Sequence, residues 1–157
     1  MLDRIFPKQV SKPYQGKMIA KWGFIVMSVL TVLRSLAHIF LPDGGAQLIA
    51  TIPLDTFTES GSTAIIGLFA QWGLIQLMFG LLYLIVLWRY QSLIPLMWLF
   101  ILFEWTGRLL VGLAKPLVTV DLVPGAVGNL IFPVVALVML VLSLKEQIKE
   151  ERKSQPN

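Results

Sequence analysis

Four long apolar stretches, separated by short breaks rich in polar residues, proline and glycine, make up most of the chain. A membrane-spanning helix needs about 20 predominantly apolar residues, and each stretch reaches that length. The pattern therefore predicts an all-α integral membrane protein, a four-helix bundle of antiparallel spans that forms one domain over residues 1–157. The predicted spans cover approximately residues 18–41, 63–88, 92–114 and 122–144.

The breaks predict how the spans are connected. Pro42–Gly45 ends the first span, because proline and glycine interrupt a helix. The turn at residues 88–91 is so short that the second and third spans must be antiparallel neighbours. The outer loop, residues 42–62, is too apolar for a freely solvated segment, so we expect it to lie on the interface or to fold over the bundle. The tail, residues 145–157, mixes Lys and Glu at helical spacing, which predicts a solvated continuation of the fourth helix.

The basic residues lie almost entirely on one side of the predicted spans. Ten lysines and arginines occupy the N-terminal flank, the turn at residues 88–91 and the tail, whereas Lys115 alone lies on the other side. Lysine and arginine near the ends of spans are enriched on the cytoplasmic side of a membrane. We therefore predict that both termini are cytoplasmic and that the protein resides in a bacterial inner (plasma) membrane.

Composition narrows the classes of function. The chain is 56% hydrophobic and only 14% charged, and its net charge of +4 comes from the basic ends of the spans, so it does not indicate nucleic-acid binding. It has no cysteine and one histidine, which excludes a disulfide framework, a thiolate site and a histidine-based metal or haem centre within one chain. No nucleotide-binding or hydrolase motif occurs. We predict no catalytic residues, no metal and no resident cofactor, and leave a quinone or a lipid open as ligand.

Strongly polar side chains interrupt the apolar stretches at seven positions: Arg34, His38, Gln71, Gln76, Glu104, Arg108 and Asn129. An ionisable group inside a bilayer costs about 2.5–3.5 kcal/mol or more, so such groups normally face the bundle interior, pair with each other or mark a site. At a rise of about 1.5 Å per residue, most of the seven fall in the outer half of the membrane. The sequence therefore predicts one polar pocket that opens toward the outer leaflet.

Helical spacing indicates which polar side chains share a face. Two pairs are four residues apart, Arg34 with His38 and Glu104 with Arg108. Gln71 and Gln76 are five apart, about 140° around a helix, so both cannot point inward. Because Gly67 shares the face of Gln71, we expect Gln71 to be the pocket residue. The candidate ligand-binding residues are therefore Arg34, His38, Gln71, Glu104, Arg108 and Asn129.

Small and aromatic residues predict how the helices pack. The second span carries four small residues that allow close approach of a neighbouring helix, Gly67, Ala70, Gly73 and Gly80. Four aromatic residues near span ends are typical of an interfacial belt, Trp22, Trp88, Tyr90 and Trp98. Trp72 and Trp105 lie deeper, where core packing or lipid contact is the expected role.

The polar cluster supports three interpretations: a ligand or partner site, a structural network, and a proton or ion pathway. Two arginines against one glutamate leave an excess positive charge in a low-dielectric place, which favours an anion, a phosphate headgroup, a quinone carbonyl or a partner's carboxylate. Alternatively, the same residues form a structural ion-pair network that fixes the register of the helices. His38 lies near the outer interface, where a histidine can be solvated, and nothing nearby in the sequence forms a catalytic triad with it.

Part of the chain resembles a known group of proteins. Arg34 late in the first span, the glycine-rich stretch Gly67–Gly80 and the third-span segment Phe103–Leu110 (FEWTGRLL) form a pattern similar to that of the DoxX-like group, small four-span bacterial membrane proteins. The resemblance implies a four-helix membrane bundle but little about function, because members of this group and of related families are mostly of unknown function or act as accessory subunits near quinone and thiol redox enzymes. This chain has no cysteine, which argues against direct thiol chemistry.

These observations together predict a non-catalytic binding or accessory subunit of a membrane. Its polar pocket would take a lipid, a quinone or another anionic or carbonyl ligand. One alternative is a purely structural subunit of a larger membrane complex, and another is a quinone-linked oxidoreductase subunit. The predicted partners are the lipid bilayer and either a larger complex or further copies of the chain, with no nucleic acid.

Overall fold

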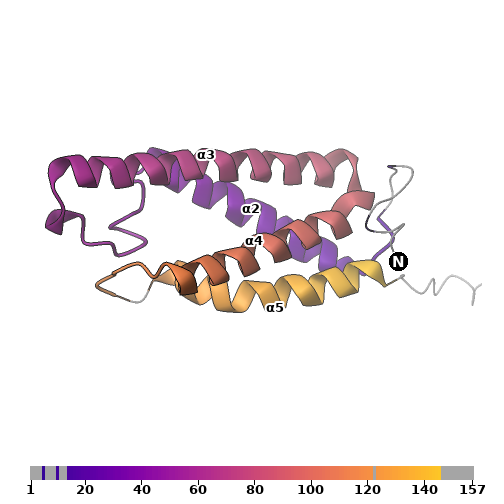
Figure 1. The fold of residues 1–157 in the computed structure, drawn as a ribbon. Helices are drawn as coiled ribbons and strands as arrows, with labels where there is room; N and C mark the ends of the chain where they lie inside the picture. The colour runs from indigo at the N-terminus through magenta and orange to yellow at the C-terminus, as the bar shows by residue number, and fades with distance from the viewer. Residues whose placement is uncertain (1–4, 6–9, 11–13, 122, 146–157) are drawn as a thin grey trace, which may run out of the picture.

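The computed structural model describes residues 5, 10, 14–121 and 123–145. Within these residues the regular secondary structure consists of helices, without strands. Four of the helices are long and apolar enough to cross a membrane. They are α2 (Met18–Phe40), α3 (Glu59–Arg89), α4 (Ile94–Ala114) and α5 (Pro124–Leu144) (Figure 1). Two short 3-10 turns, η1 (Leu54–Thr56) and η2 (Gln91–Leu93), precede α3 and α4. The predicted all-α fold with four membrane-length helices is confirmed.

The helix bounds agree with the predicted spans to within two residues except at the start of α3. α3 begins at Glu59, because the Thr58 side chain accepts a hydrogen bond from the backbone N–H of Gly61 and caps the helix N-terminus. At the other end of the chain, α5 stops at Leu144, and Lys145 has extended backbone angles. The predicted helical continuation therefore does not start directly after α5, and residues 146–157 lie outside the described part of the chain.

The helices pack as two pairs, α2 with α3 and α4 with α5. In Figure 1, α2 runs diagonally, from α5 at one end of the bundle to α3 at the other. We call the first end the turn end, because it holds residues 89–93, and the second the loop end, because it holds residues 41–58 and 115–121. The two pairs diverge toward the loop end (Figure 1).

Contacts at the turn end join the two pairs. The backbone N–H of Lys17 donates to the carbonyl of Leu142 at 3.1 Å, and Trp98 Nε1 donates to the carbonyl of Ala20 at 3.1 Å. Phe24 of α2 packs edge-on against Trp98 of α4, with ring centroids 6.1 Å apart. Phe24 and Trp98 belong to one hydrophobic cluster that contains most of the buried apolar side chains of the helices. The main core therefore closes the turn end of the bundle.

Trp98 does not belong to an interfacial belt as predicted. Its side chain is only 1% exposed, because the indole lies between α2 and α4 and its N–H reaches the Ala20 carbonyl. Trp22 and Trp88, in contrast, are 62% and 72% exposed. Position near a span end was therefore insufficient to separate a core tryptophan from surface tryptophans.

Two glycines of α3 bring this helix close to α2. A Cβ atom added at Gly73 would lie 2.7 Å from His38 Cβ, and one added at Gly80 would lie 2.8 Å from Val32 Cγ2. Both distances are far below van der Waals contact, so a side chain at either position would push the helices apart. At Gly67, which the sequence placed in the same group, an added Cβ would meet nothing within 4 Å, so this glycine does not serve the contact.

The segment between α2 and α3 folds against the first turns of α3. Ala46, Ile52 and Leu54 are buried, and they pack against apolar side chains of α3 that include Phe69. This matches the expectation of a segment that folds over the bundle.

The Asp43 carboxylate orders the beginning of this segment. It accepts hydrogen bonds from the backbone N–H groups of Gly45, Gln47 and Leu48, at 2.6–3.0 Å. Partial burial alone would raise the pKa of Asp43, but these hydrogen bonds from Leu48, Gly45 and Gln47 together outweigh it and hold the pKa below its usual value. The carboxylate therefore stays ionised and keeps the chain reversal after α2 in place.

Replacing Gly73 by alanine is expected to destabilise the protein by about 1–3 kcal/mol, because the new methyl group has no room between α2 and α3. Gly67→Ala is the matched control on the same helix, and it should be neutral or stabilise by up to about 1 kcal/mol through helix propensity. Thermal unfolding of both variants in the same detergent measures the difference. Equal midpoints for the two variants would contradict the assigned α2–α3 contact.

Candidate functional site

A cavity of about 630 Å³ lies where the two helix pairs diverge. Residues of α2, α3, α4 and α5 line it, together with parts of the segments at the loop end. Its walls are mainly apolar, and its polar lining side chains include Arg34, His38, Gln76, Glu104, Arg108 and Asn129. Five of these six are candidates from the sequence, so the fold brings most of the predicted polar residues to one place.

The two arginines lie against the same pair of tryptophans. The Arg108 guanidinium carbon is 4.6 Å from the Trp72 ring centroid and 4.7 Å from that of Trp105. For Arg34 both distances are 5.3 Å. A cation over an aromatic face is stabilised by the ring quadrupole, and more strongly where water is excluded. Trp72 and Trp105 thus hold the two charges, a role that the sequence, which indicated core packing or lipid contact, did not predict.

Gln76 supplies the shared acceptor between the arginines. With its amide oriented to suit its neighbours, Gln76 Oε1 accepts from Arg34 Nη2 at 2.6 Å, from Trp72 Nε1 at 3.1 Å and from Arg108 Nη1 at 3.3 Å. The side chain is buried on the face of α3 that also carries Gly73 and Gly80. One neutral oxygen therefore connects α2, α3 and α4 at the centre of the site.

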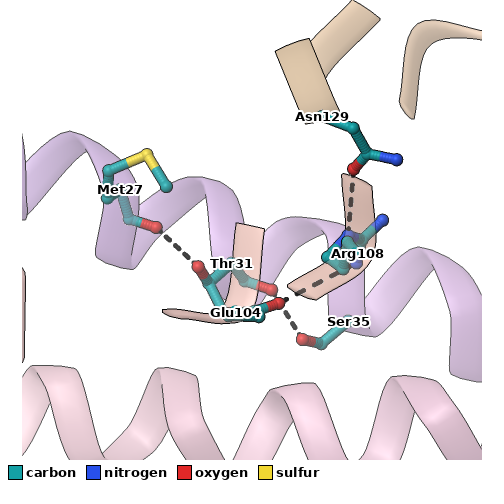
Figure 2. Close-up of polar contacts among 6 residues, drawn as sticks. All are labelled: Met27, Thr31, Ser35, Glu104, Arg108 and Asn129. Atoms are coloured by element: carbon teal, nitrogen blue, oxygen red, sulfur yellow. Dashed lines mark hydrogen bonds and ion pairs between the residues drawn. The ribbon is translucent and has the colours of Figure 1, made fainter. Parts of the chain in front are cut away.

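Arg108 has two further partners, shown in Figure 2. Its Nε donates to Asn129 Oδ1 of α5 at 3.2 Å, and its Nη1 lies 3.8 Å from Glu104 Oε1, one turn earlier on α4. The Glu104 side chain is 37% exposed, against 19% for Arg108. The predicted pairing of Glu104 with Arg108 is confirmed, as a long ion pair rather than a hydrogen-bonded one.

His38 is buried rather than solvated, with 3% exposure. Its Nδ1 lies 2.7 Å from the carbonyl oxygen of Gly44, and because a carbonyl only accepts, Nδ1 carries the proton and donates. The imidazole stacks on Trp72 at 5.2 Å and meets Phe69 edge-on at 5.6 Å. His38 thus ties the end of α2 to the following chain reversal and supports the ring of Trp72.

The expectation that Gln71 points into the pocket is wrong. Gln71 is exposed and is not among the lining residues, whereas Gln76 is buried in the cavity wall. The physical reason is that α3 contacts α2 through Gly73 and Gly80 rather than through Gly67. Gln76 lies three residues after Gly73 and four before Gly80, so it is on the same buried face. Gly67, which shares a face with Gln71, makes no close contact.

Hydroxyl groups near the site are satisfied within α2. Thr31 Oγ1 donates to the carbonyl of Met27 at 2.8 Å, and Ser35 Oγ donates to the carbonyl of Thr31 at 2.5 Å (Figure 2). Such bonds to the preceding turn are the usual arrangement for Ser and Thr in a membrane helix. The charged donors available to a bound molecule come from the arginines, while Asn129, Trp105 and Thr119 add neutral donor groups to the lining.

The arrangement favours binding of an oxygen-bearing group over metal or nucleophilic chemistry. Among the described residues, no group of three or more His, Cys, Asp or Glu side chains could hold a metal ion. Two guanidinium groups in a largely apolar cavity are suited to a carboxylate, a phosphate or a carbonyl oxygen. No family model, no curated protein and no solved structure gives a match to this chain, and the resemblance to the DoxX-like group stays a prediction.

Replacing Gln76 by leucine is expected to destabilise the protein by about 1–3 kcal/mol, because the arginines and Trp72 lose their common acceptor in a buried place. Gln71→Leu, an exposed change on the same helix, is the control and should shift stability by less than about 0.5 kcal/mol. Thermal unfolding in lipid nanodiscs measures both. A Gln76→Leu variant as stable as the control would show that the shared acceptor is unimportant.

Proposed function

We propose that this chain is an integral membrane binding or accessory subunit whose cavity holds a small, mainly apolar ligand by an oxygen-bearing group. A lipid, a quinone or another anionic or carbonyl compound belongs to this class. The cavity volume of about 630 Å³ falls within the range of about 300–1,000 Å³ that small-molecule sites occupy.

The observation that carries the proposal is the pair of guanidinium groups in the cavity wall. Arg34 and Arg108 both lie within 5.3 Å of Trp72 and of Trp105, and both donate to Gln76. A bilayer disfavours charge, so two adjacent positive groups at membrane depth are costly unless they serve a bound partner. A ligand oxygen placed between them would offset that cost.

A purely structural role is the second candidate, and a specific observation favours it. Gln76 and Asn129 connect the arginines to α3 and α5, so the cluster also holds helices of the two pairs together. Interhelical hydrogen bonds of this kind are worth about 0.6–2 kcal/mol each. The two candidates differ in whether the cavity is occupied in the membrane.

We also propose antiparallel spans with both termini in the cytoplasm of a bacterial cell. The positive-inside pattern of the sequence carries this orientation. Two contacts at the turn end support it, since Lys21 Nζ donates to Gln91 Oε1 at 3.0 Å and Lys17 N donates to the Leu142 carbonyl at 3.1 Å. Lys17, Lys21, the turn and the end of α5 thus lie at one end of the bundle.

Native mass spectrometry tests the binding proposal. The protein, extracted from its membrane in mild detergent, is expected to carry a small non-covalent adduct. Arg108→Gln should lower its occupancy about tenfold or more, because a hydrogen bond to a charged group is lost. Arg89→Gln, an exposed change at the end of α3, is the matched control and should keep the adduct. An adduct-free native protein, or equal occupancy in both variants, would favour the structural candidate.

Single-cysteine labelling tests the orientation, because the chain has no cysteine of its own. Asp121→Cys and Tyr90→Cys place one exposed thiol at the loop end and one at the turn end. A membrane-impermeant maleimide applied to intact bacterial cells should modify the first thiol and reach the second only after permeabilisation. Labelling of Tyr90→Cys in intact cells would reverse the assigned orientation.

A further inference from the structure

The positive charges of the site are oriented by neutral groups. The hydrogen-bond acceptors of Arg108, Gln76 Oε1 and Asn129 Oδ1, are amide oxygens without charge. Glu104 Oε1 lies 3.8 Å from Arg108 Nη1, beyond hydrogen-bond distance, and its side chain is 37% exposed. The guanidinium groups are therefore fixed in position while their charge is only partly compensated.

Arg34 keeps most of its donors for another group. Within the described residues its hydrogen-bond acceptor is Gln76 Oε1, although a guanidinium carries five N–H donors. No side-chain nitrogen in this part of the chain is both fully buried and unpaired, so the nitrogens of Arg34 that do not bond Gln76 keep some exposure. Because Arg34 lines the cavity, its guanidinium group is available to a molecule bound there.

The charge balance selects the charge of the ligand. Among the described lining residues the cavity has two guanidinium groups, Arg34 and Arg108, and one carboxylate, Glu104. With His38 neutral, the sum is +1. A ligand with one negative charge cancels it, whereas a neutral ligand leaves an unpaired charge and a dianion creates one of opposite sign.

The walls of the cavity select the orientation of the ligand. On α4, Gly112 and Leu113 line the cavity one turn beyond Arg108, and Leu117 continues the wall into the loop end. From Arg108 to Leu113 the helix rises about 7.5 Å, and this stretch offers no charged side chain. Met27 and Leu30 line the cavity on the turn side of Arg34, but more of the apolar lining lies on the loop side of the arginines, so the apolar part of a ligand would extend mainly toward the loop end.

We infer that the ligand is a single-chain amphiphile with one carboxylate, bound with that carboxylate between Arg34 and Arg108 and with its apolar chain toward the loop end. This rests on the proposed binding function and specifies it. The orientation is opposite to that of a phospholipid in the outer leaflet, whose headgroup lies outside its chains. A carboxylate also fits the fork of donors on a guanidinium better than a single carbonyl oxygen does.

Native mass spectrometry with dodecanoate, dodecanamide and dodecyl methyl phosphate tests the charge and the head group. We expect dodecanoate to bind at least about tenfold more tightly than dodecanamide, which has the same length and no charge. The advantage should disappear in Arg34→Gln and persist in Arg89→Gln. Equal binding of dodecanamide would overturn the carboxylate inference while leaving the proposed function intact. Stronger binding of the phosphodiester would assign a phosphate head group instead, and absence of binding by all three probes would argue against both proposals.

Two glycines of α4 test the orientation. Gly112 lines the cavity and Gly107 does not, and a Cβ added at either would meet nothing within 4 Å. Gly112→Phe should therefore fill the loop side of the cavity and weaken dodecanoate binding about tenfold or more, by excluding most of the chain. Gly107→Phe, about 140° around the same helix, should bind as the native protein does. Equal affinity of the two variants would show that the chain lies elsewhere.

Discussion

The constraint on which the rest of this structure depends is the placement of two guanidinium groups side by side at membrane depth. Each charge would be prohibitive alone in hydrocarbon, and the pair adds mutual repulsion. The protein meets this cost with aromatic faces and amide oxygens rather than with matching carboxylates. Trp72 and Trp105 each lie within 5.3 Å of both guanidinium carbons, and Gln76 Oε1 accepts from both arginines. The result is a cluster that is well oriented and still positively charged.

The backbone geometry that permits this cluster comes from two glycines. Because Gly73 and Gly80 leave no side chain between α2 and α3, the face of α3 between them lies directly against α2, and Gln76 belongs to that face. The α4–α5 pair packs against this unit through the main core at the turn end, where Trp98 and Phe24 are buried. Farther along, the pairs diverge, and the space between them becomes the cavity. The polar cluster thus lies where the packing of the bundle opens.

Much of the fold was predictable because a membrane requires long apolar helices, and four such stretches are visible in the sequence. The prediction that Gln71 rather than Gln76 faces the pocket was wrong, because the buried face of α3 is set by the glycines that contact α2, and Gly67 is not one of them. The spacing of Gly73, Gln76 and Gly80 carried that signal, since these positions share one helix face. The roles of Trp72 and Trp105 were not predictable in the same way. A tryptophan at membrane depth is equally compatible with lipid contact, and only the three-dimensional meeting of α2, α3 and α4 brings the arginines to it.

A structural network that only holds the helices together and a ligand-binding site make different demands on the same residues. The structural network is most stable when every donor has a protein partner and the charges cancel, because a partly satisfied buried network is less stable than an apolar core. Gln76 and Asn129 meet that demand for part of the cluster. The free donors of Arg34, the exposure of Glu104 and the apolar cavity beyond Arg108 do not. The contacts between helices therefore explain how the arginines are held, but they leave part of the positive charge uncompensated beside the cavity, and we propose that a negatively charged ligand completes the network there.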